Sequence, residues 1–496
     1  MKHSKFILKI TLLVVVMLAV VALVACDDAE PESDINGLYY WHLDKYETNT
    51  EIVESYGIYG DAQRYKSYIY FINGSETQEY ADNTWGVPVR NAIVRASFNR
   101  EGNYSDPVVI VPKRVLTKNE GGGFAIIYDW IYYATPSINS DGSVSTTHID
   151  FMRTRIDAKV TTLLATVEGR DIDYYFTPTR VFYKRASHST VNYIDFSAVD
   201  DSQSSNDGAG IVHDVFLENV ETVKWIYSQM SKYIYYTTKT GDVGSKFYNT
   251  LNRILPDGTG QEVLIDENSY SSTKDDGDSN KNTFRIDLID LEHSGSEGHL
   301  IYTKTSLNDG QEKLEGFFVC AIKESYELDL VHERCLLKEE VLNDVELNSV
   351  YYYTNMYGGS GDAIVTKSDG KVYFIDIRNE GNSEKLLIDE EVKFVCVTNS
   401  NILYIDAENR LWIQCDTSVF LNKRRIVLDD TTDIDLNRTK IVSYYFGWFT
   451  SVDYLMYVDK NTGKSKIISL EDLYGWYSNG DGEEIFEEVT SYEIGI

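Results

Sequence analysis

The sequence predicts an all-β protein, a single β-propeller that follows a signal peptide and a short disordered tether. Proline occurs only 7 times and tyrosine 38 times in 496 residues, and long helical patterns are nearly absent. Short apolar or aromatic runs alternate with polar turns and recur in units of roughly forty to fifty residues. We therefore divide the chain into a signal peptide at residues 1–25, a flexible acidic tether at 26–36 and a β-propeller domain at 37–496.

The N-terminus has the pattern of an export signal. Residues 1–9 carry three lysines and no acid, and residues 10–25 are apolar apart from Thr11. A basic start followed by an apolar run that is short for a membrane span is typical of a signal peptide. The run ends in Leu23-Val24-Ala25-Cys26, which resembles the lipobox of bacterial lipoproteins.

This resemblance implies cleavage before Cys26 and attachment of acyl chains such as palmitate to that cysteine. The protein would then be lipid-anchored in the cell membrane, on its extracytoplasmic side. Two or three acyl chains would hold it stably, because each buried methylene contributes about 0.8 kcal/mol. The alternative is an uncleaved signal anchor in which Cys26 is incidental. The residues after Cys26 (DDAEPESDING) are acidic and have no large apolar residue before Ile35, so we expect a flexible tether.

Charge and cysteine usage exclude several functions. The formal net charge is −32, so the surface should repel DNA and RNA, and we expect no nucleic-acid partner. No CxxC pair, HExxH motif or glycine-rich phosphate loop occurs, so we predict no metal site and no cofactor. Cys320 and Cys335 lie in runs that could be neighbouring strands. Both a disulfide and two buried, reduced cysteines fit this pattern.

Eight candidate units support a ring of blades. A four-stranded blade cannot bury both faces alone, so blades pack side by side and close into a ring. We favour eight blades over seven, and over two or three β-sandwiches in series, because no Pro/Gly-rich linker divides the chain. The polar insertions 200–210 and 271–282 are expected between units. The units are recognised from these runs: SYIYFING (67–74), WIYYATP (130–136), DYYFTPTRVFYKR (173–185), YIYYTT (233–238), HLIYTKT (299–305), SVYYYTN (349–355), VKFVCVT (392–398) and SYYFGWFTSVDYLMYVDK (443–460).

Several of these runs resemble a known blade type. "IYYAT", "IYYTT", "LIYTK" and "YYYTN" look like degenerate relatives of the YWTD-type blade. "LPDGTGQEVLI" (255–265) resembles the strand–DGTG–strand turn of that group and of TolB-like propellers. Asp257-Gly258 would supply the tight turn, and Gly260 a residue able to adopt a positive φ. The resemblance implies a bacterial lipoprotein of an uncharacterised propeller family, and it supports the fold rather than a function.

No local motif predicts a catalytic residue. Asp276, Asp278, Asn280 and Asn282, with Asp287 farther on, alternate as calcium ligands do, but Lys281 stands where an EF-hand loop needs glycine. A solvated acidic insertion explains this stretch better. "YGGSGDA" (357–363) lacks the last glycine of a nucleophile elbow and is better explained as a hairpin turn.

The predicted function is binding or scaffolding at the cell envelope. A propeller offers a wide rigid face, and its partner would be an envelope protein, peptide or glycan. The alternative is a polysaccharide-acting enzyme, a glycosidase or lyase, with carboxylates in the propeller channel. Tryptophans could stack on sugars, although we expect most of them to fill the space between blades: Trp130, Trp225, Trp412 and Trp448.

Overall fold

The computed structural model describes most of the chain from residue 62 to residue 493. The predicted signal peptide (1–25), Cys26 and the predicted tether lie outside the described residues. The described ranges are 62–65, 68–74, 90–98, 104–117, 123–199, 211–225, 233–239, 248–266, 269, 284–294, 297–308, 310–322, 328–330, 333–338, 345–355, 359–376, 383–397, 401–415, 424–447, 450–461, 465–469 and 492–493.

The described strands form eight four-stranded sheets, each built from consecutive antiparallel strands. The first four sheets contain β1 (Ala62–Tyr65), β2 (Tyr68–Gly74), β3 (Arg90–Phe98) and β4 (Tyr104–Val111); β5 (Phe124–Ile127), β6 (Trp130–Ile138), β7 (Val144–Arg155) and β8 (Thr161–Glu168); β9 (Ile172–Phe176), β10 (Arg180–Arg185), β11 (Val191–Asp195) and β12 (Val212–Leu217); and β13 (Val220–Lys224), β14 (Ile234–Thr238), β15 (Leu251–Ile254) and β16 (Glu262–Ile265). The last four contain β17 (Phe284–Ser294), β18 (Glu297–Asn308), β19 (Gln311–Ile322) and β20 (Arg334–Lys338); β21 (Val345–Asn355), β22 (Gly359–Lys367), β23 (Val372–Asp376) and β24 (Ser383–Ile388); β25 (Val392–Val397), β26 (Asn401–Asp406), β27 (Leu411–Cys415) and β28 (Arg424–Leu428); and β29 (Ile434–Gly447), β30 (Thr450–Asp459), β31 (Ser465–Ser469) and β32 (Tyr492–Glu493).

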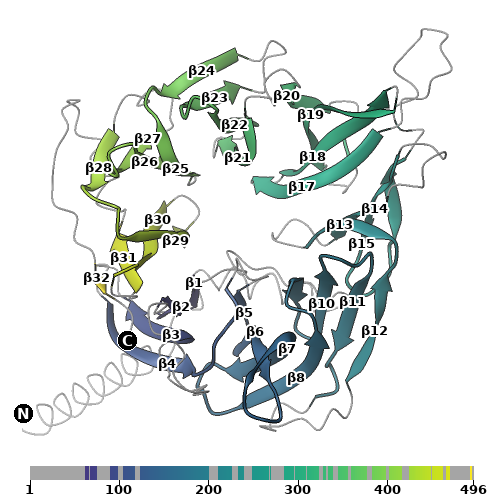
Figure 1. The fold of residues 1–496 in the computed structure, drawn as a ribbon, viewed down its shortest axis with the longest axis vertical. Coiled ribbons are helices and arrows are strands. Elements are labelled where there is room, and N and C mark those ends of the chain that lie inside the picture. The colour runs from purple at the N-terminus through teal and green to yellow at the C-terminus, as the bar shows by residue number, and fades with distance from the viewer. Residues whose placement is uncertain are drawn as a thin grey trace, which may run out of the picture.

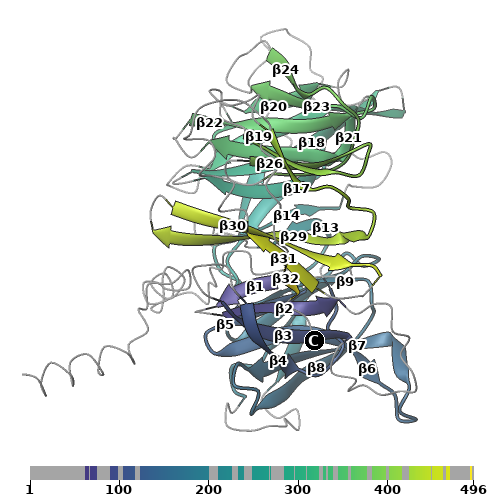
Figure 2. The same ribbon diagram turned by 90° about the vertical axis from the view of Figure 1, so that its left-hand side faces the viewer.

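The sheets follow one another around a common centre, in sequence order (Figure 1). First strands of several neighbouring sheets contact one another, as β13 and β17 do, and β29 of the last sheet contacts β1 of the first. Figure 2 views the same ring from its edge. The predicted single β-propeller is confirmed, and separate sandwiches are excluded. The eight sheets correspond to the larger of the two blade counts considered from the sequence.

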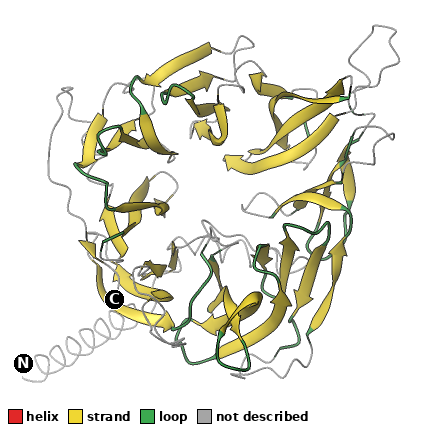
Figure 3. Cartoon of the chain, viewed as in Figure 1, coloured by secondary structure: helices red, strands yellow, loops and turns green. Residues whose placement is uncertain are grey.

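The described residues contain strands and loops but no helix (Figure 3). Within them, no helix is long and apolar enough to span a bilayer.

Each predicted unit coincides with one sheet, although several units begin one strand late. WIYYATP, YIYYTT and HLIYTKT are the second strands β6, β14 and β18. One expected position was wrong. Residues 200–210 connect β11 to β12 within the third sheet, whereas 271–282 do lie between two sheets, before β17.

Large aromatic side chains fill the space between sheets, as expected from the sequence. One core cluster joins the second, third and fourth sheets and contains Trp130 and Trp225. Another joins the sixth and seventh sheets and contains Trp412. Further clusters bridge the first and second, the fourth and fifth, and the seventh and eighth sheets. These three tryptophans therefore belong to the core, while Trp448 lies outside the described residues.

Hairpin turns between second and third strands hold the next sheet in place. The carbonyl of Gly370, in the turn between β22 and β23, accepts a hydrogen bond from Val392 N–H at the start of β25. Asn409 of the seventh sheet and Ser189 of the third accept equivalent bonds from Thr431 and Val220. Backbone hydrogen bonds thus link each of these turns to the beginning of the next blade.

The DGTG turn between β15 and β16 has the predicted backbone. Gly258 and Gly260 have φ values of 87° and 64°. The side chain of Asp257 accepts hydrogen bonds from the backbone N–H and the hydroxyl of Thr259, at 2.8 and 2.7 Å. This carboxylate closes the turn, while the glycines adopt the left-handed conformation that costs other residues energy.

Cys320 and Cys335 lie on the neighbouring strands β19 and β20, as predicted, and neither forms a disulfide. Cys335 is directly opposite Phe318, so Cys320 is its diagonal neighbour on the same face of the sheet. Diagonal pairs lie about 7–8 Å apart at Cα, which exceeds the span of a disulfide. The structure therefore agrees with the reduced alternative.

Candidate functional site

Charged side chains gather on the first strands of the third, fourth and fifth sheets. Of these three strands, Figure 1 shows β13 and β17 toward the centre of the ring, while β9 belongs to the sheet beside them. The three strands carry Asp173 on β9, Glu221 and Lys224 on β13, and Arg285 and Asp287 on β17. Among the described inner-strand residues they are natural candidates for contact with a ligand, because they are polar, at least partly exposed and carried by a rigid framework.

Asp173 is held from two sides. Lys184 of β10 lies directly opposite it in the sheet, so their side chains share one face. The indole Nε1 of Trp225, which follows β13, donates a hydrogen bond of 2.8 Å to Asp173 Oδ2. Trp225 is fully buried and stacks on Tyr175 with 6.2 Å between ring centroids. The carboxylate is therefore positioned by the core of the neighbouring sheet.

Both members of the cross-strand pair have perturbed pKa values. Desolvation raises the pKa of Asp173, against the hydrogen bond from Trp225 and the positive charges of Lys224 and Lys184. Desolvation also lowers the pKa of Lys184, against the negative charges of Glu221 and Asp173. Asp173 remains accessible to solvent although protein surrounds it. Ionisable groups of this kind are concentrated at functional sites. We call Asp173, Lys184, Glu221, Lys224 and Trp225 the inner-strand site.

A second inner-strand group is fully occupied with ion pairs. Arg285 Nε lies 3.1 Å from Asp287 Oδ2, and its Nη1 lies 3.0 Å from a carboxylate oxygen of Glu312 on β19. Asp287 therefore faces an arginine. The other positions of the calcium-like pattern, 276–282, lie outside the described residues. In the described part of the chain, no cluster of three or more His, Cys, Asp or Glu side chains has the arrangement of a metal site.

The arrangement suits recognition of charge better than hydrolysis. A glycosidase needs two carboxyl groups facing one sugar, about 5 to 10 Å apart. At the inner-strand site the carboxylates of Asp173 and Glu221 instead alternate with lysines, and Asp287 pairs with Arg285. A ligand there would meet fixed positive and negative groups side by side, as a peptide backbone terminus or a charged side chain requires.

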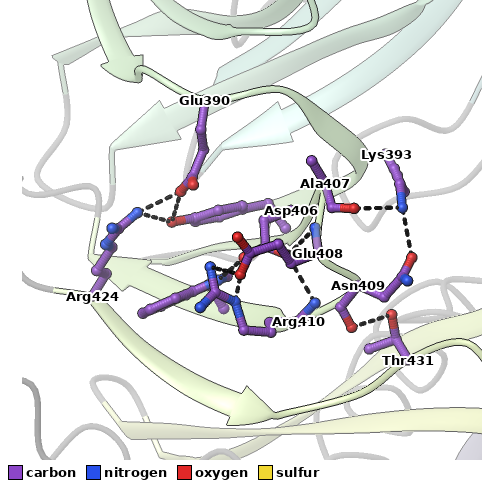
Figure 4. A network of polar contacts seen from close by, with 11 residues as sticks. Glu390, Lys393, Asp406, Ala407, Glu408, Asn409, Arg410, Arg424 and Thr431 are labelled. Atoms are coloured by element: carbon purple, nitrogen blue, oxygen red, sulfur yellow. Dashed lines mark hydrogen bonds and ion pairs between the residues drawn. The ribbon is translucent and has the colours of Figure 1, made fainter.

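The seventh sheet contains a denser polar network, but it is structural (Figure 4). Asp406, at the end of β26, is 1% exposed. It accepts hydrogen bonds from the backbone N–H of Glu408 and Arg410, from Arg410 Nε at 2.7 Å and from Trp412 Nε1 at 2.8 Å. Burial alone would raise the pKa of Asp406, yet the bonds from Trp412 and Arg410 outweigh it and the pKa is lowered.

The rest of this network packs around the indole of Trp412. Tyr404 stacks on it at a centroid distance of 6.4 Å, and the Arg424 guanidinium lies 4.4 Å from its centroid. Glu390, in the connection from the sixth sheet, pairs with Arg424 and accepts a hydrogen bond from Tyr404. Because Asp406, Tyr404 and Trp412 are buried at its centre, we assign the network to the packing of the seventh sheet.

Sequence reasoning did not identify the inner-strand site. Two features of the sequence could have pointed to this site: Asp173 interrupts the apolar run IDYYF, and Lys184 ends the run VFYK. Neither residue reveals its partner, because Trp225 lies 52 positions after Asp173. Ser360 of the YGGSGDA stretch lies on strand β22 near the hairpin from β21, in agreement with the hairpin interpretation. Cys26, the predicted lipidation site, lies outside the described residues.

No protein-family model and no curated protein matches the chain. Solved structures that resemble it include the polysaccharide lyase Uly1, with 7% identity, a TM-score of 0.39 and coverage of 68% of this chain and 86% of that one. AztD of Citrobacter koseri has 9% identity and a TM-score of 0.34, covering 88% and 96%. Sqt1 of Saccharomyces cerevisiae has 11% identity and a TM-score of 0.35, covering 69% and 90%. At these values the likenesses carry no argument about the activity of this chain.

Proposed function

We propose that the protein is a lipoprotein, anchored through Cys26 on the extracytoplasmic side of a bacterial membrane, whose propeller binds a peptide or protein of the cell envelope at the inner-strand site. The β-propeller fold supports a binding or scaffolding module. The lipobox-like sequence before Cys26 supports the anchor.

One observation carries the assignment of the site. Asp173 and Lys184 are neighbours on adjacent strands, the surrounding protein shifts the pKa of each, and the buried indole of Trp225 fixes the carboxylate. Charged groups that the protein has already oriented lose little conformational freedom on meeting a ligand, so they can contribute to affinity. The net charge of −32 favours ligands with basic groups, which Asp173 and Glu221 would accept.

The test measures binding to the purified full chain of a panel of lysine- and arginine-rich peptides, beside a panel of envelope glycans. Asp173→Asn should weaken binding of the best basic peptide by at least about tenfold, the effect of losing one charged contact, whereas Lys184→Met removes a positive charge beside Asp173 and should not weaken it. Lys371→Met is the matched control, because it removes an exposed pair with Asp389 on the sixth sheet. Equal affinity in all variants would place the ligand elsewhere.

A glycosidase or lyase is the second candidate, and one observation favours it. A general acid needs a raised pKa, and desolvation raises that of Asp173. If the purified protein cleaves an envelope polysaccharide and Asp173→Asn abolishes cleavage, the enzyme replaces the binding module as the function.

A further inference from the structure

A lysine and a glutamate are in contact in the interior of the fifth sheet, remote in sequence from the inner-strand site. Lys304 lies in the middle of β18, and Glu333 immediately precedes β20. Lys304 Nζ contacts Glu333 Oε2, and the hydroxyl of Tyr302 donates a hydrogen bond to Glu333 Oε1. The side chains of Lys304 and Glu333 are only 5% and 12% exposed.

Aromatic rings surround the amine. Lys304 Nζ lies 4.2 Å from the ring centroid of Phe318 and 5.7 Å from that of Phe284. Tyr302 and Phe318 stack with 6.3 Å between centroids. Burial lowers the pKa of Lys304, although the negative charge of Glu333 opposes this change. The contact thus combines a desolvated amine, a carboxyl group and a hydroxyl donor aimed at one carboxyl oxygen.

We propose that Lys304 and Glu333 are joined by an isopeptide bond that the folded chain forms itself. A proton passes from the ammonium to the carboxylate, which leaves a neutral amine beside a neutral acid. Nζ then attacks Cδ, the Nζ–Cδ bond forms, and the Cδ–Oε2 bond breaks. Oε2 leaves as water with the proton already received and one proton of the amine. The step consumes no oxidant, reductant or co-reactant.

The surrounding groups favour this reaction over a permanent ion pair. The hydroxyl of Tyr302 donates to Oε1, the oxygen that carries the negative charge of the tetrahedral intermediate, as an oxyanion donor does. The folded sheet holds the reacting groups in contact, which replaces a bimolecular encounter. An amide is neutral, so it avoids the desolvation penalty of two buried charges. The product would tie the second strand of the blade to the start of the fourth.

Peptide mapping of the reduced and denatured full chain tests the proposal. Trypsin does not cleave after an acylated lysine, so residues 286–313 should stay in one piece and be joined to residues 324–334. The joined product should have the summed mass of the two peptides less one water. Fragmentation should place the link at Lys304 and Glu333. The proposal is overturned if trypsin cleaves after Lys304 and both peptides have their unmodified masses.

Variants separate a folded-state reaction from an artefact. Tyr302→Phe retains the ring and removes the oxyanion donor, so bond formation should slow by about 100-fold. Lys304→Arg retains the charge and should give no link. The internal control is Lys466, which lies 2.7 Å from Asp459 but is 23% exposed, and it should remain cleavable by trypsin. A loss of water at Lys466 as well would mean that sample handling forms the bond, and this would overturn the proposal.

Discussion

The carbonyl oxygen of Gly370 accepts a hydrogen bond from the backbone N–H of Val392 at 2.8 Å. This bond joins the turn between the second and third strands of the sixth sheet to the first strand of the seventh. Gly370 has a φ of 76°, and a Cβ atom there would lie 2.6 Å from Cγ and 3.4 Å from Cα of Glu391. A single glycine therefore meets two requirements, a left-handed backbone and close approach of the next blade.

Replacing this glycine should destabilise the propeller. We expect Gly370→Ala to lower the free energy of unfolding by about 3 kcal/mol, because strain at a positive φ adds to the displacement of Glu391. Gly142→Ala is the matched control. Gly142 has a φ of 83° in the corresponding turn of the second sheet, with nothing within 4 Å of the added Cβ. Its loss should be about 1 kcal/mol. Equal losses in urea unfolding would show that contact with the next blade is unimportant.

Removing the Asp406 carboxylate should cost more than removing a comparable exposed one. Asp406→Ala leaves the indole N–H of Trp412 and the backbone N–H of Arg410 without their acceptor in the interior, so we expect a loss of about 3 kcal/mol. Asp141→Ala, in the exposed turn of the second sheet, removes only the bonds from Ser143 and should have a much smaller effect. Thermal unfolding of both variants measures the difference, and similar midpoints would contradict the structural role of the network.

The pH dependence of stability should reveal Asp173. Its pKa in the folded state is raised above the ordinary value of 3.8. The folded state therefore binds this proton more tightly than the unfolded state. The contribution of Asp173 to the free energy of unfolding is full below pH 3.8 and is lost as the pH rises through the folded-state pKa. Asp173→Asn should remove this decline.

Asp406 provides a control of opposite sign for that titration. Its folded-state pKa is lowered, so its contribution is present above the ordinary value and is lost as the pH falls. Denaturant unfolding across acidic pH should show Asp173→Asn and Asp406→Asn changing the profile in opposite directions. Parallel changes would contradict the assigned environments.

Cys320 and Cys335 of the fifth sheet should differ in reactivity. Burial raises the pKa of Cys320 to about 12, with further contributions from Glu333 and Asp329. Almost no thiolate is then present at pH 8, while Cys335 is only half-buried. Iodoacetamide should therefore modify Cys335 in the native protein and Cys320 only after unfolding, as measured by peptide mass. Early modification of Cys320 would mean that this part of the sheet opens readily.

Changing Cys26 tests the proposed lipid anchor. Cells grown with a fatty-acid analogue should label the wild-type protein, and Cys26→Ala should abolish the label and leave the signal uncleaved. Cys396→Ala is a suitable control, because it also removes one cysteine but lies far from the lipobox-like motif. Labelling that survives Cys26→Ala would exclude the lipoprotein assignment.

The sequence by itself determined the features that depend on neighbouring residues. The turn at Asp257-Gly258 and the positive φ at Gly260 follow from local backbone preferences. The all-β class and the eight repeated units follow from strand-length apolar runs separated by such turns, and each unit became one sheet. First strands such as β13 were missed because charged residues interrupt their apolar runs. A strand is predicted from the sequence only where apolar residues recur regularly on one face.

Only the tertiary structure decided which side chains meet. Trp225 and Asp173 are 52 residues apart in the sequence, and Lys304 and Glu333 are 29 apart. The alternation of polar and apolar residues along a strand indicates which face is buried. It does not indicate which distant residue packs against that face. The third and fourth sheets pack against one another, and this packing brings Lys224 close to Asp173, which is paired with Lys184 within its own sheet. Desolvation, which shifts the pKa values of Asp173 and Lys184, depends on the packing of several blades. A linear pattern of residues contains no measure of that packing.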